Sequence, residues 1–407
     1  MTEGSLLEVF LYEKRIGTLT RLPDDRTIFS FDEDYIADQN RDVLSLGFKD
    51  HHGQLVSNTR PYRKVMPFFA NLLPEERLRF YLAERAGVNP ERDFFLLRVL
   101  GADLPGAITI RSEDEETWPR EDGHLEHNQS DSEKALHFSL AGVQLKFSAA
   151  SNATGGLTIP AKGIGGSWIV KLPSEKYDGV PENEYSMMTL ARALGIDVPA
   201  LELIEVNEIG NLPEEIATMG GKALAIERFD RLSDGSRVHI EDFAQIFQVY
   251  PKDKYRKASI VNIANVIAVE SDGMDDIEEL IRRLTFNTLI GNGDMHLKNW
   301  SVIYPDRRTA RLAPAYDFVS TIPYLPNDQS ALQYSRTRRF DEFTVSELSH
   351  LAERAKLPEY LVVNTALETV EAFLNVWRVE KKNLPLHDHV TTAIEENLKK
   401  VPLAIGA

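Results

Sequence analysis

The feature that most constrains this chain is a short polar run, Gly291 to Trp300, with the sequence GNGDMHLKNW. It follows a helical pattern and leads into the apolar alternation from Ser301 to Tyr304. Asn299 lies five positions after Asp294, and a second acid, Asp317, follows a turn-rich link. This pattern suits phosphoryl transfer from a nucleotide, in which one Asp accepts the proton of the attacking hydroxyl while an Asn and a second Asp hold Mg²⁺ against the phosphates.

The spacing from Asp294 to Asn299 is that of the protein-kinase catalytic loop, and Asp317-Phe318 stands where the metal-binding Asp-Phe pair would stand. An ordinary helix end explains the same residues, because Asp, Gly and Asn are common in turns. The kinase interpretation therefore depends on whether the rest of the chain supplies the other parts of a nucleotide site.

Composition predicts a soluble globular protein of two or three sub-domains, since 43% of its 407 residues are hydrophobic and 27% are charged. There is no cysteine, so neither disulfides nor thiolate metal sites are expected. The first residues lack a basic segment followed by an apolar core, and no run of about eighteen apolar residues occurs. We therefore expect a cytoplasmic protein with no membrane segment.

The net charge of −17 disfavours direct binding to nucleic acid and favours basic partners. The densest basic cluster consists of Lys252, Lys254, Arg256 and Lys257. From the sequence alone, we interpret this cluster as a solvated face rather than as a binding site.

Residues 1–110 are predicted to form an α+β sub-domain. Residues 8–22 alternate as a β-hairpin, residues 28–31 form a third strand, helical periodicity begins at Pro67, and residues 107–110 close the sheet. Residues 111–135 are acidic and nearly without aliphatic side chains, which indicates a linker or loop.

Residues 136–245 alternate short strands with glycine-rich turns. The segment 138–147 is either a plain hairpin or a turn whose backbone amides approach phosphate oxygens, with Lys146 adding charge. Lys171 ends an apolar strand, as a solvated edge residue or as the lysine that pairs with nucleotide phosphates. Glu184 opens a helix, either as a cap or as the ion-pair partner of Lys171. The strand 222–230 runs into a turn where an adenine would meet backbone groups.

Residues 246–407 are predicted to be mainly helical. One helix starts at Asp275 and is predicted to turn one side of its surface toward the core. That side consists of Ile277, Leu280, Ile281, Leu284 and Thr288, a core-facing stripe. Three more are expected at 345–355, 357–377 and 390–399. The order of these parts predicts an α+β, protein-kinase-like fold of two lobes. Its N-terminal lobe would be a mixed β-sheet lobe with an extra N-terminal module, and its C-terminal lobe would be all-helical. The glycine loop departs from ordinary kinases, because it lacks the G-x-G-x-x-G run.

In these motifs the chain resembles the HipA family of serine/threonine kinase toxins from bacterial toxin–antitoxin systems. The motifs that carry the resemblance are Ser139 to Lys146, Ile169 to Pro173, Asn183-Glu184-Tyr185, Glu227 to Arg231, Glu241-Asp242, Gly293 to Asn299 and Tyr316-Asp317. The resemblance spans nearly the whole chain, since the first hundred or so residues resemble the family's N-terminal coupling module.

The resemblance implies a role for each matching residue. Asp294 is expected to be the catalytic base, and Asn299 and Asp317 the Mg²⁺ ligands. The other implied nucleotide contacts are Ala141, Gly142, Val143, Gln144 and Lys146 over the phosphates, Lys171 beside them, Glu227, Arg228 and Phe229 at the hinge, and His296, Lys298 and Tyr316 lining the site. Ser139 falls where family kinases autophosphorylate, which ejects the loop and stops the enzyme. Two added negative charges would repel nucleotide phosphates.

The resemblance thus implies an ATP- and Mg²⁺-dependent protein serine kinase that inactivates an aminoacyl-tRNA synthetase. It also implies a HipB-like DNA-binding antitoxin as partner, so that contact with DNA is indirect. Two other functions stay open: a silent pseudokinase that acts as co-repressor, and a small-molecule phosphotransferase of the aminoglycoside type. The presence of Lys171, Asp294, Asn299 and Asp317 argues against the first, and the N-terminal module and the Ser139 loop argue against the second.

Overall fold

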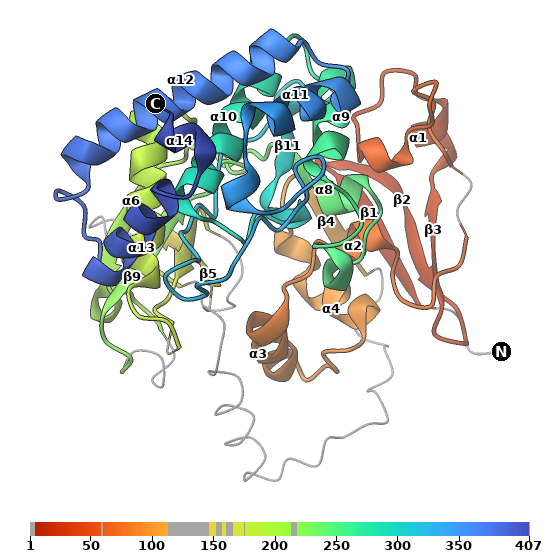
Figure 1. Ribbon diagram of the computed structural model, residues 1–407. Helices are drawn as coiled ribbons and strands as arrows, with labels where there is room; N and C mark the ends of the chain where they lie inside the picture. The colour runs from red at the N-terminus through yellow and green to blue at the C-terminus, as the bar shows by residue number, and fades with distance from the viewer. Residues whose placement is uncertain are drawn as a thin grey trace.

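The computed structural model describes residues 5–57, 60–112, 146–151, 157–159, 166–174, 176–212 and 218–406. Figure 1 shows three parts: a red-to-orange N-terminal module, a yellow-green sheet with one long helix, and a blue-green helical part that lies against both. No helix in the described residues is both long and apolar enough to span a bilayer.

The N-terminal module is a four-stranded antiparallel sheet in the order β3-β2-β1-β4. Alternate side chains of β1 are buried, as expected for a sheet with one face on a core. The elements are β1 (Leu6–Leu11), β2 (Lys14–Arg21), β3 (Thr27–Phe31), α1 (Glu33–Ala37), α2 (Pro67–Ala70), α3 (Glu76–Ala86), α4 (Asp93–Leu100) and β4 (Ile108–Arg111). The predicted hairpin, third strand and closing strand are confirmed.

The second sheet has five strands in the order β6-β5-β7-β9-β8. Its strands are β5 (Lys146–Ser151), β6 (Leu157–Thr158), β7 (Trp168–Lys171), β8 (Leu201–Glu205) and β9 (Lys222–Glu227). Helix α6 (Val180–Ala193) packs against β8 and β9. It begins three residues before Asn183, because Pro181 is favourable in a first helical turn, so Glu184 lies inside the helix rather than at its start.

The C-terminal part is mainly helical, as predicted. Its helices are α8 (Phe243–Ile246), α9 (Ile260–Glu270), α10 (Asp275–Ile290), α11 (Val345–Ala355), α12 (Glu359–Glu380), α13 (Asp388–Leu398) and α14 (Pro402–Ile405). The stripe on α10 is buried, and Gly291 ends this helix with φ +67°, in the left-handed region that glycine adopts without strain. The glycine therefore turns the chain from α10 into the polar run.

Two details refine the predicted α+β fold. Every pairing between the described strands is antiparallel, so the sheets are not mixed in strand direction. The helical part also carries a small sheet of β10 (His239–Asp242), β11 (Ser301–Tyr304) and β12 (Arg311–Leu312). Strand β11 directly follows the polar run and is mostly buried. It pairs with β10 on one edge and with β12 on the other, so its backbone amide and carbonyl groups find hydrogen-bond partners.

Strand β10 is where the N-terminal module docks. The Nε2 atom of His239 lies 2.8 Å from the carbonyl oxygen of Leu44, and the amide of Ala107 donates to Nδ1 at 3.4 Å. These two partners require the neutral tautomer with its proton on Nε2. Burial lowers the pKa of His239 to about 4, which favours that neutral form.

The buried carboxylate of Glu241 joins the module to the small sheet. It accepts hydrogen bonds from the hydroxyls of Ser45 and Tyr304 and, at 2.8 Å, from the amide of Leu46. Burial raises the pKa of Glu241 to about 7, even though the bonds from Ser45 and Tyr304 lower it. The folded protein therefore binds a proton here more tightly than the unfolded chain does.

Glu241→Gln is expected to flatten the pH dependence of stability. The raised pKa contributes stability fully below about pH 4.5 and loses it as the pH rises through about 7, a change of roughly 3 kcal/mol at 1.36 kcal/mol per pKa unit. Urea unfolding at pH 5 and pH 8 measures this: the wild type should lose more unfolding free energy between the two than the variant. Equal losses would contradict the assignment.

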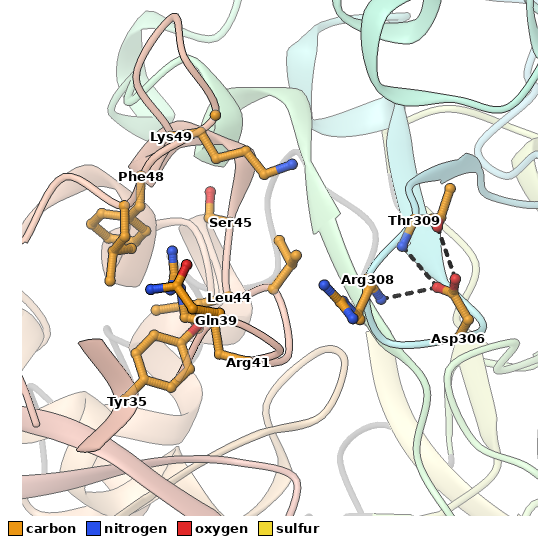
Figure 2. A pocket seen from close by; sticks show the side chains of 13 residues that line it. Tyr35, Gln39, Arg41, Leu44, Ser45, Phe48, Lys49, Asp306, Arg308 and Thr309 are labelled. Carbon is orange, nitrogen blue, oxygen red and sulfur yellow. Dashed lines mark hydrogen bonds between the residues drawn. The ribbon is translucent and has the colours of Figure 1, made fainter. Parts of the chain in front are cut away.

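A pocket of about 460 Å³ lies between the module and the turn that joins β11 to β12. In Figure 2 the side chains of Tyr35, Arg41 and Lys49 come from the module side, and Asp306 and Arg308 come from the turn. Asp306 accepts hydrogen bonds from the amides of Arg308 and Thr309, which fixes the turn. The predicted site residues do not line this pocket, so it is separate from the candidate site.

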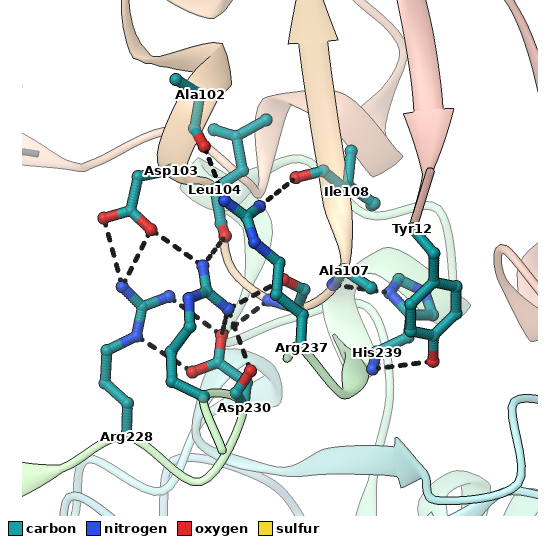
Figure 3. A network of polar contacts seen from close by, with 12 residues as sticks. Tyr12, Ala102, Asp103, Leu104, Ala107, Ile108, Arg228, Asp230, Arg237 and His239 are labelled. Carbon is teal, nitrogen blue, oxygen red and sulfur yellow. Dashed lines mark hydrogen bonds and ion pairs between the residues drawn. The ribbon is translucent and has the colours of Figure 1, made fainter. Parts of the chain in front are cut away.

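A second contact joins the module to the segment after β9, through a buried group of four charges (Figure 3). Arg228 pairs with Asp230 at 2.9 Å and with Asp103 of the module at 3.2 Å. Arg231 pairs with the same two acids, each at 2.8 Å. Asp230 also accepts the amide of Gly106 at 2.8 Å. The hinge predicted from the sequence is therefore braced by the module.

Candidate active site

The strand lysine lies between two carboxylates from segments that are far apart in the sequence. Nζ of Lys171, at the end of β7, forms ion pairs with Glu184 on α6 and with Asp317 from the loop after β12. Burial alone would lower the pKa of Lys171, but attraction to Asp317 and Glu184 outweighs it and raises the pKa. The solvated-edge interpretation is thus wrong, because Lys171 is buried, and the ion pair with Glu184 is confirmed.

The polar run folds so that its own side chains hold its backbone. Nδ2 of Asn299 donates to the carbonyl oxygen of Asp294 at 2.8 Å, and the amide of Asp294 donates to Oδ1 of Asn292 at 3.0 Å. Nδ2 of Asn292 lies 3.4 Å from the carbonyl oxygen of Asp317. The buried Asn292, which the sequence did not single out, therefore joins the two acid loops.

These residues fit a phosphate-bound cation. Because Nδ2 of Asn299 is the donor to Asp294, its Oδ1 is the amide atom able to coordinate a metal. The described residues contain no cluster of three or more His, Asp or Glu side chains able to hold a metal. Mg²⁺ does not require such a cluster, since it is commonly bound by one or two carboxylates together with substrate phosphates and water. Asp317 has φ +56°, an uncommon conformation for a residue other than glycine, as is often found at functional sites.

His296 lies beside Asp294 but is not a charged partner for it. Its Nε2 is 4.0 Å from Oδ1 of Asp294. Burial, and then the nearby charge of Lys254, lower the pKa of His296 to about 3, so the ring is neutral at ordinary pH. Its Nδ1 atom has no hydrogen-bond partner among the described residues. A buried polar atom without a partner suits the predicted place of His296 at the wall of a ligand site.

Tyr255 is a contact of Asp294 that the sequence did not predict. Its hydroxyl donates to Oδ1 of Asp294 at 2.5 Å, and its ring packs edge-on against His296 with 4.9 Å between centroids. Tyr255 lies between two members of the basic cluster, Lys254 and Arg256. That cluster therefore lies beside the predicted catalytic base.

Three predicted nucleotide contacts have side chains engaged elsewhere. Nζ of Lys298 donates to the carbonyl oxygen of Asn71 in the module, at 2.8 Å. The hydroxyl of Tyr316 donates to the carbonyl oxygen of Lys298 at 2.9 Å, and its ring lies 5.9 Å from that of Phe229. Arg228 is held by its ion pairs with Asp103 and Asp230. Phe229 and Tyr316 thus come together, whereas Lys298 and Arg228 brace the module.

Of the predicted phosphate loop, Ser139, Ala141, Gly142, Val143 and Gln144 lie outside the described residues. Lys146 is the first residue of β5, where its backbone pairs with that of Lys171. Glu227 ends β9 and is exposed, with its amide donating to the carbonyl oxygen of Ala200 at 2.8 Å.

Asn183 holds α6 against the segment that follows Asp317. Its Nδ2 donates to the carbonyl oxygen of Ser320 at 2.9 Å, and its Oδ1 accepts the amide of Ser320 at 3.1 Å. Asn183 is fully buried and directly precedes Glu184. One side chain thus ties the helix that carries Glu184 to the segment that follows Asp317, a role that its place in the motif Asn183-Glu184-Tyr185 did not reveal.

Asn183→Ala is expected to lower the unfolding free energy by roughly 1–3 kcal/mol, because it leaves buried backbone groups of Ser320 without partners. Asn375→Ala, an exposed Asn on α12, is the matched control and should change stability by less than about 0.5 kcal/mol. Urea unfolding of both variants measures the difference. Equal effects at the two positions would contradict the role assigned to Asn183.

A five-stranded antiparallel sheet with a buried Lys–Glu pair, followed by a helical part with an Asp-x4-Asn loop and a second Asp, defines a protein-kinase-like fold. Residues 7–111 match the HipA N-terminal domain, and residues 138–377 match the HipA-like C-terminal domain. The chain belongs to the HipA family.

Relatives and one solved structure agree with this assignment. The Sinorhizobium fredii protein "Putative kinase Y4dM" is 53% identical over 408 residues, covering 99% of this chain and 98% of its own length. The Shewanella oneidensis "Serine/threonine-protein kinase toxin HipA" is 27% identical over 404 residues, covering 88% and 85%. The structure of Shewanella oneidensis HipA with HipB and operator DNA has a TM-score of 0.76 at 22% identity, covering 98% of this chain and 97% of that chain. At this identity the likeness shows the fold alone.

Proposed function

We propose that the protein is an ATP- and Mg²⁺-dependent serine/threonine protein kinase of the HipA type. The observation that carries the proposal is the set of contacts that joins Lys171, Glu184 and Asp317 and, through Asn292, links them to Asp294 and Asn299. A protein that only binds a partner has no need for these five side chains in one place. The relatives that carry kinase names support the same activity.

In the proposed reaction, Asp294 accepts the proton of a serine or threonine hydroxyl. The hydroxyl oxygen forms a bond to the γ-phosphorus of ATP, the bond to the β-phosphate oxygen breaks, and ADP leaves. Asn299 and Asp317 would hold Mg²⁺, which neutralises charge on the phosphates. Lys171 would contact the phosphates, and backbone groups from Glu227 to Phe229 would contact adenine. Residues 136–245 and 246–407 are the proposed lobes, with residues 1–110 as the coupling module.

Three further parts of the proposal rest on the family. Ser139 is proposed as the site of self-inactivating autophosphorylation, and an aminoacyl-tRNA synthetase as the protein substrate. A HipB-like antitoxin is the proposed partner, as supported by the Shewanella oneidensis complex of HipA, HipB and operator DNA. The net charge of −17 supports contact with DNA through that partner rather than directly.

The test is the intact mass of the purified chain before and after incubation with ATP and Mg²⁺. We expect the addition of one phosphate, mapped by peptide analysis to Ser139, or a chain that already carries it. Binding of ATP without any added mass, in the presence of candidate protein substrates, would overturn the kinase proposal in favour of a co-repressor. Transfer to a small alcohol instead of to protein would indicate a small-molecule phosphotransferase.

A further inference from the structure

The loop from Pro251 to Lys257 is fastened to the polar run that carries Asp294. The hydroxyl of Tyr255 donates to Oδ1 of Asp294 at 2.5 Å, and the amide of Leu297 donates to the carbonyl oxygen of Lys254 at 3.3 Å. From a separate segment, Nη2 of Arg338 donates to the carbonyl oxygen of Tyr255 at 3.0 Å. Three hydrogen bonds therefore fix this loop and Arg338 at the proposed catalytic base.

The loop carries four basic residues and one acidic residue, Asp253, in a chain with an excess of 17 acidic residues. Lys254 is already paired, with Glu75 at 2.9 Å. Lys252, Arg256 and Lys257 are exposed. Together with Arg338, these three form no ion pair with any carboxylate in the part of the chain that the structure describes. Arg336, two positions before Arg338, differs in this respect, because it already pairs with Glu347 at 2.8 Å.

Tyr255 also marks where a substrate must arrive. A hydroxyl that gives its proton to Asp294 has to come within hydrogen-bond reach of its carboxylate, and the hydroxyl of Tyr255 already occupies one of the carboxylate oxygens. Arg256 and Lys257 directly follow Tyr255 in the chain. An extended peptide advances roughly 3.3–3.6 Å per residue, so side chains a few positions from the target hydroxyl come near this loop.

Resting on the proposed kinase function, we propose that Lys252, Arg256, Lys257 and Arg338 form a docking surface for an acidic segment that flanks the phosphorylated residue of the protein substrate. Carboxylates of that segment supply the anions that these four cations lack, and attraction between opposite charges favours binding and correct orientation. An acidic peptide is favoured over RNA because the whole-chain charge of −17 opposes a polyanion as long as a nucleic acid, whereas a short acidic segment meets only the local cations.

The test compares two serine peptides that differ only in their flanking residues, Glu-rich in one and Lys-rich in the other. With ATP and Mg²⁺, the wild type should show a kcat/KM about tenfold higher for the Glu-rich peptide, and the preference should shrink at high salt because exposed charges are screened. R256E/K257E should remove or reverse it. R378E/K382E makes the same charge change on two exposed residues, one in the last turn of α12 and one just after it, and should keep the preference.

A binding measurement keeps the proposal testable even without phosphate transfer. By fluorescence anisotropy, R256E/K257E should bind the labelled Glu-rich peptide about tenfold more weakly than R378E/K382E does. No transfer to any peptide together with normal peptide binding would overturn the kinase function and leave the docking surface standing. Transfer without acidic preference, or a preference that survives R256E/K257E, would overturn the docking surface alone. Loss of binding to bulk RNA in R256E/K257E with peptide preference intact would assign the surface to nucleic acid instead.

Discussion

Asp294→Asn is expected to lower the rate of phosphate transfer by about 10²–10⁴-fold, which is the usual contribution of a positioned general base. The amide cannot accept the proton of the attacking hydroxyl. The fold should survive, because the side chain of Asp294 is 47% exposed and the loop is held by its backbone bonds to Asn292 and Asn299. The measurement is the rate of phosphate incorporation from labelled ATP, beside a thermal melt.

Asp272→Asn is the matched control for this prediction. Asp272 is an exposed loop residue with no ion pair to a described residue, so the same chemical change should leave both rate and melting temperature unaltered. A transfer rate of Asp294→Asn within a few-fold of wild type would remove Asp294 from the role of base. A large fall in its melting temperature would mean that the lost rate reports damage to the fold.

Lys171→Met is expected to have the largest combined effect on stability and activity. It removes the cation between Glu184 and Asp317 and leaves a carboxylate buried without its partner, which typically costs about 3–5 kcal/mol of unfolding free energy. It also removes the charge proposed to meet the nucleotide phosphates. Urea unfolding and titration with a fluorescent ATP analogue measure the two effects separately.

A second substitution distinguishes the effect of Lys171 on stability from its effect on nucleotide binding and phosphate transfer. In Lys171→Met combined with Glu184→Gln, the buried carboxylate becomes neutral, so part of the lost stability should return. Nucleotide binding and phosphate transfer should stay lost, because the cation is still absent. Recovery of both together would mean that Lys171 acts only through the stability of the fold.

Local patterns in the sequence predicted most of the fold. The helix α11 and the start of α10 were predicted to the residue, because their apolar stripes and end residues lie within one segment. Alternation likewise predicted the hairpin of β1 and β2, and it placed the closing strand β4 within one residue of its observed bounds. The pairing of β10 with β11 could not be predicted in this way, since the two strands lie about 60 residues apart and neither strand's own pattern identifies its partner.

The same limit explains what was missed in the candidate site. Asn183 and Ser320 are 137 residues apart in the sequence, Arg228 and Asp103 are 125 apart, and Tyr255 and Asp294 are 39 apart. No local spacing encodes such contacts, which depend on how separate elements pack. The place of the basic cluster beside Asp294 could not be predicted for the same reason, because only the folded chain brings the two segments together.

The four-charge group of Arg228, Asp230, Arg231 and Asp103 has a consequence for how the chain unfolds on heating. Arg228 and Arg231 retain only 7% and 10% of their side-chain exposure, and one of the two acids that neutralise them, Asp103, belongs to the N-terminal module. If the module unfolded alone, Asp103 would be lost and Asp230 would be the one carboxylate left to pair with both buried arginines, which is unfavourable. The module, which ends near residue 111, is therefore expected to unfold together with the rest of the chain rather than independently. A single calorimetric transition, shared by the N-terminal module and the rest of the chain, is the thermodynamic signature that follows from this arrangement.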